Sequence, residues 1–416
     1  MSSQNSPSPL LPKALSPNAW SRRSFLRLSA AASAVAAFPV MTEPLLAQAA
    51  AASLAPTAAP VSHPPILIDQ NENPLGPCPA AREAVSAAAA QGGRYMMSWT
   101  DDFEKNFAQS EGLKPEFVQS FPGSSGPLHH AVVAFTSASR SYVTADPGYE
   151  AGLFAAQTSG AKVVKVPLTR TYAHDVKAMI TAAPDAGLFY ICSPNNPTGT
   201  LTPHADVEYL LEHKPQGSIV MVDEAYIHFA GSQSAVDLVK AEKDVIVLRT
   251  FSKLHGMAGL RCGVAMAKPE LLEKIVNRMG WNAMPTTAIA AASASLADAG
   301  LVAERRRINA EVRGEIFQWL DAHGYSYIPS ESNFFMLDTK RPARSVIDAM
   351  SKRGVRIGRI WPAMPTYSRI TVGTHDEMAM FRDAWQEVMK GAVSAQVGGL
   401  AELKGWRILD GIRVRA

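Results

Sequence analysis

The 416-residue chain has few cysteines and little excess charge, and both shortages exclude classes of protein. Its cysteines, Cys78, Cys192 and Cys262, are too few and too scattered for a disulfide framework or a zinc site. The net charge is +3, and the first 49 residues alone supply +3, so the remainder is close to neutral. Charge therefore does not indicate a nucleic-acid surface, and we expect no nucleic-acid partner.

Other absences narrow the chemistry further. The sequence contains no glycine-rich dinucleotide fingerprint and no P-loop. His129 and His130 have no carboxylate partner at ligand spacing, and adjacent residues on a helix point about 100° apart, so we expect no metal. The chain is 47% apolar and 19% charged, an ordinary globular composition over a length sufficient for two domains.

Residues 1–49 are predicted to be an export signal. The stretch SRRSFLR at 21–27 resembles the twin-arginine motif, and the apolar run at 28–40 is too short for a mature membrane span. Residues 47–49 form a small-x-small cleavage pattern, and the alanines at 50–52 offer neighbouring options. We therefore expect transient contact with the twin-arginine export machinery and a periplasmic or exported protein, or a cytoplasmic one if the leader is misread.

The rest of the chain divides into segments that differ in composition and in their pattern of apolar residues. Residues 50–64 are rich in alanine, serine and proline, which is typical of a linker. Short β-branched runs then alternate with longer helical patterns, which predicts a largely parallel sheet covered on both faces. After about Gly300 the pattern becomes that of a smaller α+β domain. The predicted parts are an N-terminal arm (65–100), a large domain (101–300), a small domain (301–390) and a tail of unknown role (391–416).

Three chemically distinctive segments follow predicted strands. SPNNPTG (193–199) follows LFYIC, VDEAYIHF (222–229) follows SIVM, and TFSKLHGMAGLRCG (250–263) follows VIVLR. Ligands of an open parallel sheet bind at the carboxyl ends of its strands, so these segments are expected to share one site. Taken singly, each segment has a plain explanation as a turn, a helix cap or a solvated lysine. Their joint order is harder to obtain by chance.

In this order, together with DQNENPLGP, RYMM, DPGYE and SRITVGT, the segments resemble the class I/II aminotransferases, which are pyridoxal-phosphate enzymes of fold type I. The most similar branch is that of the histidinol-phosphate aminotransferases, and the resemblance extends over residues 66–382. It implies an α/β fold with a mostly parallel, helix-covered sheet in the large domain and a smaller α+β domain. It also implies pyridoxal 5'-phosphate as cofactor and a homodimer, to which the arm contributes.

The resemblance assigns the catalytic groups, and each assignment has a chemical reason. Lysine condenses with an aldehyde cofactor and then moves a proton, and Lys253 is the candidate. A carboxylate beside a pyridine nitrogen keeps that nitrogen protonated, which is the role of Asp223. Asn196 and Tyr226 are expected to donate hydrogen bonds to the cofactor's phenolate oxygen, and Tyr149 is expected to pack on its ring.

The cofactor's phosphate needs backbone amides at a helix start, hydroxyls and a guanidinium. The stretch GSSGPLHH at 123–130 has such a start, with Ser125 as the expected N-cap, although the family often has an acidic pair at Ser125 and Gly126. Tyr95 resembles a residue that reaches the phosphate of the neighbouring subunit's cofactor. The other phosphate candidates are Ser124, Ser125, Gly126, Ser252 and Arg261.

Substrate recognition is assigned to a second set of residues. Arg369 in SRITVGT resembles the arginine that grips the substrate's α-carboxylate, where a planar fork selects the Cα bond that breaks. Asn333 and Arg359 are candidates for recognising the side chain, and Arg356 competes with Arg359 for that role.

The predicted function is transamination between an amino donor and a 2-oxo acid. The resemblance favours histidinol phosphate and 2-oxoglutarate, which give imidazole acetol phosphate and glutamate. Export argues for another donor, such as an aromatic amino acid, because histidine biosynthesis belongs in the cytoplasm. A decarboxylase or other lyase of the same fold and a non-catalytic cofactor-binding protein remain alternatives.

Overall fold

The computed structural model describes residues 64–279, 283–391, 406–409 and 412–415. The predicted export signal, its cleavage site and nearly all of the linker lie outside these ranges. The described residues belong to one unit of the chain, Val61–Ala416. Within them, no single helix is long and apolar enough to cross a membrane. One pair of helices, sharply bent at the break between them, has the length and composition of a span when the two are taken together.

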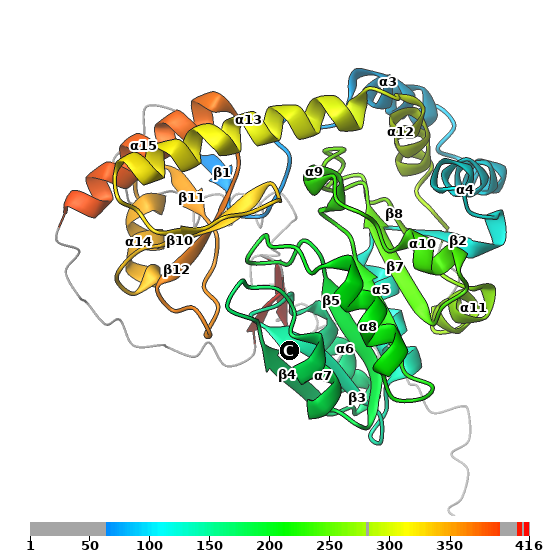
Figure 1. Cartoon of the computed structure of the whole chain (residues 1–416). Helices are drawn as coiled ribbons and strands as arrows, with labels where there is room; N and C mark the ends of the chain where they lie inside the picture. The colour runs from blue at the N-terminus through cyan, green and yellow to red at the C-terminus, as the bar shows by residue number, and fades with distance from the viewer. Residues whose placement is uncertain (1–63, 280–282, 392–405, 410–411, 416) are drawn as a thin grey trace, which may run out of the picture. The chain divides into compact units, whose positions relative to one another are not determined.

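A seven-stranded sheet with the order β2-β8-β7-β6-β5-β3-β4 forms the larger part of the fold (Figure 1). Strands β3 to β7 run parallel, and β8 pairs antiparallel with both β2 and β7. The predicted, mostly parallel sheet is therefore confirmed, with β8 as the exception. The strands are β2 (Val118–Phe121), β3 (Ser141–Asp146), β4 (Val163–Pro167), β5 (Ala186–Cys192), β6 (Ile219–Asp223), β7 (Val245–Thr250) and β8 (Gly263–Met266).

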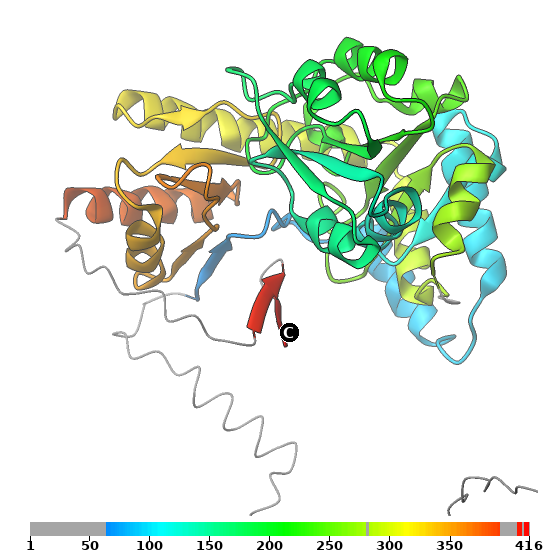
Figure 2. The ribbon, with the colours of Figure 1, turned by 90° about the horizontal axis from the view of Figure 1, so that it is seen from below.

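The central strands are apolar on both faces because helices cover both faces (Figures 1 and 2). Along β6, Val220 and Val222 enter one core cluster, and Ile219 and Met221 enter another. The first cluster includes α3 (Pro79–Ala89), α4 (Met97–Glu111), α7 (Val176–Ala182), α8 (His204–His213), α10 (Val236–Lys240) and α12 (Thr286–Ala297). The second includes α5 (Ser125–Phe135), α6 (Ala151–Ser159) and α11 (Pro269–Val276).

A third core cluster lies under two smaller sheets. One sheet has the antiparallel order β12-β10-β9, and in the other β1 pairs parallel with β11, which brings the N-terminal arm into this part of the fold. The strands are β1 (Ile66–Ile68), β9 (Tyr327–Ile328), β10 (Phe334–Asp338), β11 (Val355–Ile357) and β12 (Tyr367–Thr371). The covering helices are α13 (Leu301–Ala322), α14 (Ala343–Ser351) and α15 (His375–Lys390).

The remaining elements are short. They are η1 (Pro115–Phe117), α9 (Ile227–Ala230), β13 (Trp406–Leu409) and β14 (Ile412–Arg415), the last two forming an antiparallel pair. The seven-stranded sheet and the smaller sheets are of the kinds expected for a large α/β domain and a small α+β domain. The exact domain boundaries stay a prediction.

Candidate active site

The site lies where the parallel strands end. Asp223 is the last residue of β6, and its register partner on β5 is Cys192, the last residue of that strand. Asn196 follows the end of β5 by four residues and Lys253 follows the end of β7 by three. Parallel strands have their carboxyl ends at one edge, so segments distant in sequence meet there.

Lys253 points toward the N-terminal arm. Its Nζ donates to the carbonyl oxygen of Gln70 at 3.2 Å and lies 5.7 Å from the centre of the Tyr226 ring. The backbone next to it is also fixed by the arm, because Asn73 Nδ2 donates to the carbonyl oxygen of Leu254 at 2.7 Å. The arm therefore holds both the amine and the loop that bears it.

Asp223 is a buried carboxylate with two hydrogen-bond donors. The Tyr190 hydroxyl donates to Oδ2 at 2.8 Å, and the Ala225 amide donates to Oδ1 at 3.1 Å. Burial nevertheless raises the pKa of Asp223 from 3.8 to about 6, against the lowering effect of these bonds. A protonated pyridine nitrogen beside this carboxylate would be stabilised by it and would stabilise the ionised form in return, so Asp223 fits the predicted cofactor.

Tyr226 and Asn196 face the same region from two loops. The Tyr226 hydroxyl accepts from Asn71 Nδ2 at 3.1 Å, which leaves its own hydrogen to donate elsewhere. Burial raises the pKa of Tyr226, so the hydroxyl remains protonated at neutral pH. Asn196 Oδ1 accepts from Arg369 Nη1 at 2.7 Å.

The predicted phosphate residues form a tight cradle around Gly123. A Cβ at Gly123, whose φ is +87°, would lie 2.0 Å from Arg261 Nη2, and one at Gly263 would lie 2.5 Å from the Ser124 nitrogen. Arg261 Nη1 donates to Ser252 Oγ at 3.1 Å. The guanidinium, a hydroxyl and the start of α5 are thus held together only because both glycines lack a side chain.

The start of α5 differs from the expectation by one residue. The helix begins at Ser125, so its N-cap is Ser124, and the Ser124 side chain makes no capping hydrogen bond. The prediction that Ser125 is the N-cap was wrong, because Ser125 already has a helical conformation. The amides of Ser125 and Gly126 belong to the first turn, which has no intrahelical acceptor for them. This donor set suits a phosphate.

Arg369 occupies β12 and is buried, and Asn196 is not its only neighbour. Its Nη2 donates to the carbonyl oxygen of Asp69 at 2.9 Å, and its guanidinium carbon lies 5.3 Å from the centre of the Trp361 ring. Asn333 donates through Nδ2 to the carbonyl oxygens of Asn71 and Glu72, both at 3.2 Å. Asn333 therefore holds the arm, and its predicted contact with the substrate side chain stays a prediction.

The two competing arginines take different positions. Arg356, on β11, is about half exposed and pairs with Asp69 at 3.0 Å. Arg359 lies with its guanidinium carbon 4.7 Å from the centre of the Trp361 ring, the same ring that Arg369 approaches. The geometry therefore favours Arg359 over Arg356 as the second arginine of the site.

Two predicted residues remain less defined. Tyr149 is partly buried and packs against the core cluster that includes α5 and α6. Tyr95 is 65% exposed. Its predicted contact belongs to a neighbouring subunit and stays a prediction.

The sequence reasoning assigned no role to several residues that shape this site. In the arm these are Asp69, Gln70, Asn71 and Asn73, and elsewhere they are Tyr190, Trp361 and Glu150. The arm motif DQNENPLGP belongs to the resemblance to the family, so the sequence could have indicated that the polar residues of this motif lie at the site. Trp361 and Glu150 had no such signal.

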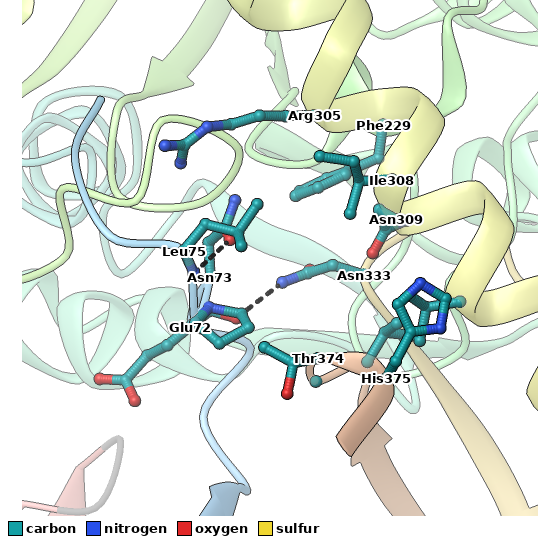
Figure 3. Close-up of a pocket in the computed structure, with 14 residues that line it drawn as sticks. Glu72, Asn73, Leu75, Phe229, Arg305, Ile308, Asn309, Asn333, Thr374 and His375 are labelled. Carbon is teal, nitrogen blue, oxygen red and sulfur yellow. Dashed lines mark hydrogen bonds between the residues drawn. The ribbon is translucent and has the colours of Figure 1, made fainter. Parts of the chain in front are cut away.

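A cavity is lined in part by residues of the arm (Figure 3). It is lined by apolar side chains such as Leu75, Phe229 and Ile308, with Asn309 and Asn333 among the polar ones. Among the described residues that line this cavity, Asn333 is the only one that was predicted to belong to the active site. The cavity is therefore distinct from the proposed cofactor cradle.

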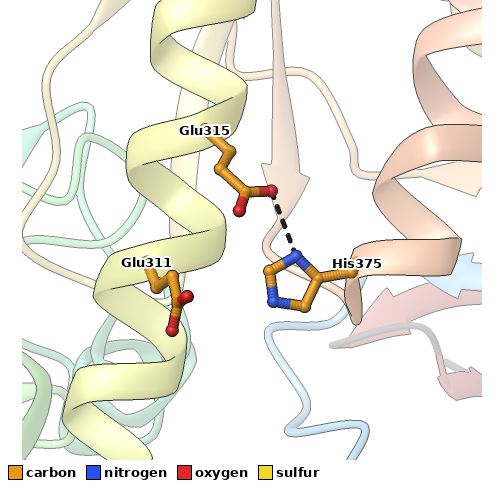
Figure 4. A group of neighbouring side chains, drawn as sticks. All are labelled: Glu311, Glu315 and His375. Carbon is orange, nitrogen blue, oxygen red and sulfur yellow. Dashed lines mark hydrogen bonds and ion pairs between the residues drawn. The ribbon is translucent and has the colours of Figure 1, made fainter.

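One group of exposed side chains has metal-ligand chemistry. The ligand atoms of Glu311, Glu315 and His375 lie within 4.8 Å of one another, and His375 Nδ1 is 3.0 Å from Glu315 Oε2 (Figure 4). Solvated acidic groups commonly gather in this way without an ion. The expectation of no metal stays a prediction.

Comparison with known proteins agrees with this geometry. The family model Aminotransferase class I and II matches residues 64–384. A histidinol-phosphate aminotransferase of Symbiobacterium thermophilum is 35% identical over 77% of this chain and 90% of the relative. An aromatic amino acid aminotransferase of Rhodococcus jostii is 34% identical over 76% of this chain and 88% of the relative.

A solved structure is also similar. The histidinol-phosphate aminotransferase from Sinorhizobium meliloti, in complex with pyridoxal-5'-phosphate, has a TM-score of 0.71 and 28% identity, over 78% of this chain and 90% of that one.

Proposed function

We propose, for a chain that belongs to the aminotransferase class I and II family, that Lys253 holds the cofactor and moves the proton when an amino group is transferred from a donor to a 2-oxo acid. The protein is a pyridoxal-phosphate-dependent aminotransferase, and its predicted fold, family, enzyme class and cofactor are confirmed. One observation supports the residue assignment above all: Lys253, Asp223 and the bonded pair Asn196 and Arg369 converge from four separate segments.

When bound, pyridoxal phosphate supplies an aldehyde and an electron-accepting ring. The chain supplies the proton chemistry around it. With that group bound, Asp223 would hold a proton on the ring nitrogen, and the Tyr226 hydroxyl would donate to the phenolate oxygen. Lys253 Nζ takes the proton from the donor's Cα, which a nearby amine does well when its position is fixed. Gln70 and Asn73 of the arm provide that fixation.

Arg369 orients the donor. A guanidinium held by Asn196 and by the Asp69 carbonyl presents its fork in one direction, and a carboxylate bound there is fixed in the plane of the fork. The Cα–H bond is then the one presented to Lys253, which favours transamination over decarboxylation. Donor and acceptor use the same site in turn, so ping-pong kinetics follow.

Similarity and geometry favour different donors. Histidinol phosphate with 2-oxoglutarate is supported by the histidinol-phosphate aminotransferases among the relatives. An aromatic amino acid is supported by the relative from Rhodococcus jostii and by the buried Trp361 ring beside both Arg359 and Arg369. The first is the proposed donor by similarity, and the second is the alternative that this site's own contacts favour.

A donor panel tests the proposal. Purified holoenzyme is mixed with histidinol phosphate, L-phenylalanine, L-tyrosine or L-glutamate, and the absorbance of the bound cofactor is followed. A change that 2-oxoglutarate reverses is expected for true donors. Release of carbon dioxide without a need for an oxo acid would instead identify a lyase, and binding without any exchange would identify a cofactor-binding protein.

The assembly and the location are proposed on sequence grounds. Tyr95, exposed before α4, supports a homodimer in which it reaches the neighbouring subunit's cofactor. Sedimentation of the holoenzyme checks the dimer, and a monomer would contradict it. Export by the twin-arginine machinery is supported by Arg22 and Arg23. Changing both to lysine should retain the protein in the cytoplasm, and unchanged fractionation would refute export.

A further inference from the structure

Glu150 lies directly opposite the second arginine of the site. It is the N-cap residue of α6, next to Tyr149, and its Oε2 is 2.5 Å from Arg359 Nη2. The side chains are 29% and 35% exposed, so the pair is partly shielded from solvent. A pair at this separation and burial keeps more of its attraction than an exposed one.

Trp361 ties this ion pair to Arg369. Its ring is buried, with Arg359 at 4.7 Å and Arg369 at 5.3 Å from its centre. The Trp361 Nε1 donates to the carbonyl oxygen of Gly148 at 3.3 Å, which fixes the turn that bears Glu150. Glu150, Arg359, Trp361 and Arg369 therefore form one continuous group.

The charges of this group add to +1. Arg369 is the cation available for the α-carboxylate, and Glu150 offsets Arg359. A donor with an anionic side chain besides its α-carboxylate, such as L-glutamate, would approach Arg359 and meet the Glu150 carboxylate at the same time. A donor with an uncharged side chain leaves the ion pair intact and packs against the Trp361 ring.

We propose that Glu150 determines the charge of the side chain that this site accepts, and that it favours uncharged, aromatic donors over anionic ones. This inference rests on the proposed function, because it takes Arg369 as the carboxylate-binding group. It names Glu150 as a specificity-determining residue that favours an aromatic amino acid over L-glutamate as the donor.

The test is the Glu150→Gln variant, which keeps the shape of the side chain and removes its charge. The ratio of kcat/KM for L-glutamate to kcat/KM for L-phenylalanine should rise about tenfold or more relative to the unmodified holoenzyme. The rise should shrink at high ionic strength because salt screens partly exposed charges. An unchanged or lower ratio would overturn the inference.

A binding measurement separates this inference from the proposed function. Glutarate and 3-phenylpropionate cannot transfer an amino group, and their dissociation constants can be obtained by calorimetry on the holoenzyme. Glu150→Gln should tighten glutarate relative to 3-phenylpropionate by a similar factor, whether or not any donor turns over. A holoenzyme without turnover whose variant shows this shift would refute the proposed function alone. Turnover without the shift would refute the role of Glu150 alone.

Two further variants show whether the effect belongs to this pair. Arg353 and Glu387 form a more exposed ion pair outside the site, at 3.1 Å, so Glu387→Gln should leave both ratios unchanged. Arg359→Gln alone should lower the ratio of kcat/KM for L-glutamate to kcat/KM for L-phenylalanine, because the Glu150 carboxylate then faces an anionic side chain without its cation. A rise in this ratio would show that Glu150 acts by another route and would overturn the proposal.

Discussion

Arg369 Nη1 donates a 2.7 Å hydrogen bond to Asn196 Oδ1, and both side chains are buried although 173 residues separate them in the chain. One residue follows a strand of the large sheet and the other lies on β12 of a small sheet. The bond joins the group proposed to bind the substrate's carboxylate to the loop proposed to bind the cofactor. Substrate orientation and cofactor position are therefore coupled through a single contact.

Replacing Lys253 by alanine should abolish transamination. The variant lacks both the amine that holds the cofactor and the base that takes the Cα proton, so we expect a loss of about 1,000-fold or more in turnover. Single-turnover absorbance measurements with the best donor provide the check. Lys352→Ala, at the C-cap of α14, serves as the control. Turnover near the original rate in Lys253→Ala would disprove the assignment.

Arg369→Lys should weaken donor binding more than it slows the chemistry of the bound donor. Lysine keeps the charge but cannot contact both Asn196 and the Asp69 carbonyl while presenting a fork to the substrate. A rise in KM of about 100-fold is expected, from the loss of a charge-assisted bidentate contact. Steady-state kinetics with an amino acid donor measure it. An unchanged KM would place carboxylate binding elsewhere.

Asp223 should make the stability of the cofactor-free protein depend on pH. Its folded pKa is raised from 3.8 to about 6, so the folded state binds the proton more tightly than the unfolded state. The contribution of Asp223 to the free energy of unfolding is then largest below about pH 4 and falls as pH rises to about 6, by about 3 kcal/mol in total.

Denaturation of the cofactor-free protein at several pH values provides the check on Asp223. The Asp223→Asn variant should lack this fall in the free energy of unfolding between pH 4 and pH 6. Bound cofactor should also reduce the fall, because a protonated ring nitrogen lowers the pKa of the carboxylate. Identical pH profiles for the variant and the original protein would contradict the assignment.

Gly123→Ala should damage the phosphate cradle. The new Cβ would lie 2.0 Å from Arg261 Nη2, and the φ of +87° is strained for alanine. We expect cofactor affinity to fall at least about tenfold as Arg261 is displaced. Titration with pyridoxal phosphate measures the change. Gly314→Ala in α13 is the matched control, because a Cβ there meets nothing within 4 Å. Equal affinity in both variants would remove Gly123 from the cradle.

Much of this arrangement could be predicted from particular residues. The runs that became β5, β6 and β7 are mainly apolar, without an alternation of polar residues, which indicates strands buried on both faces. The segments after them therefore had to meet at one edge. Lys253, Asp223 and Asn196 were located in this way. The N-cap was displaced by one residue, to Ser124, because neighbouring serines give the same local signal.

The sequence by itself determined the family, the order of the strands' functional ends and the residues available there, because these follow from local patterns along the chain. Only the tertiary structure favours Arg359 over Arg356 as the second arginine of the site. The alternation of β11 ends at Ile357, so the direction of Arg359 depends on its packing against Trp361 and not on strand periodicity. Tertiary structure also placed Glu150 opposite Arg359. The two residues are 209 positions apart, so no local sequence pattern indicates their contact, which forms only when the start of α6 and the segment after β11 come together in the fold.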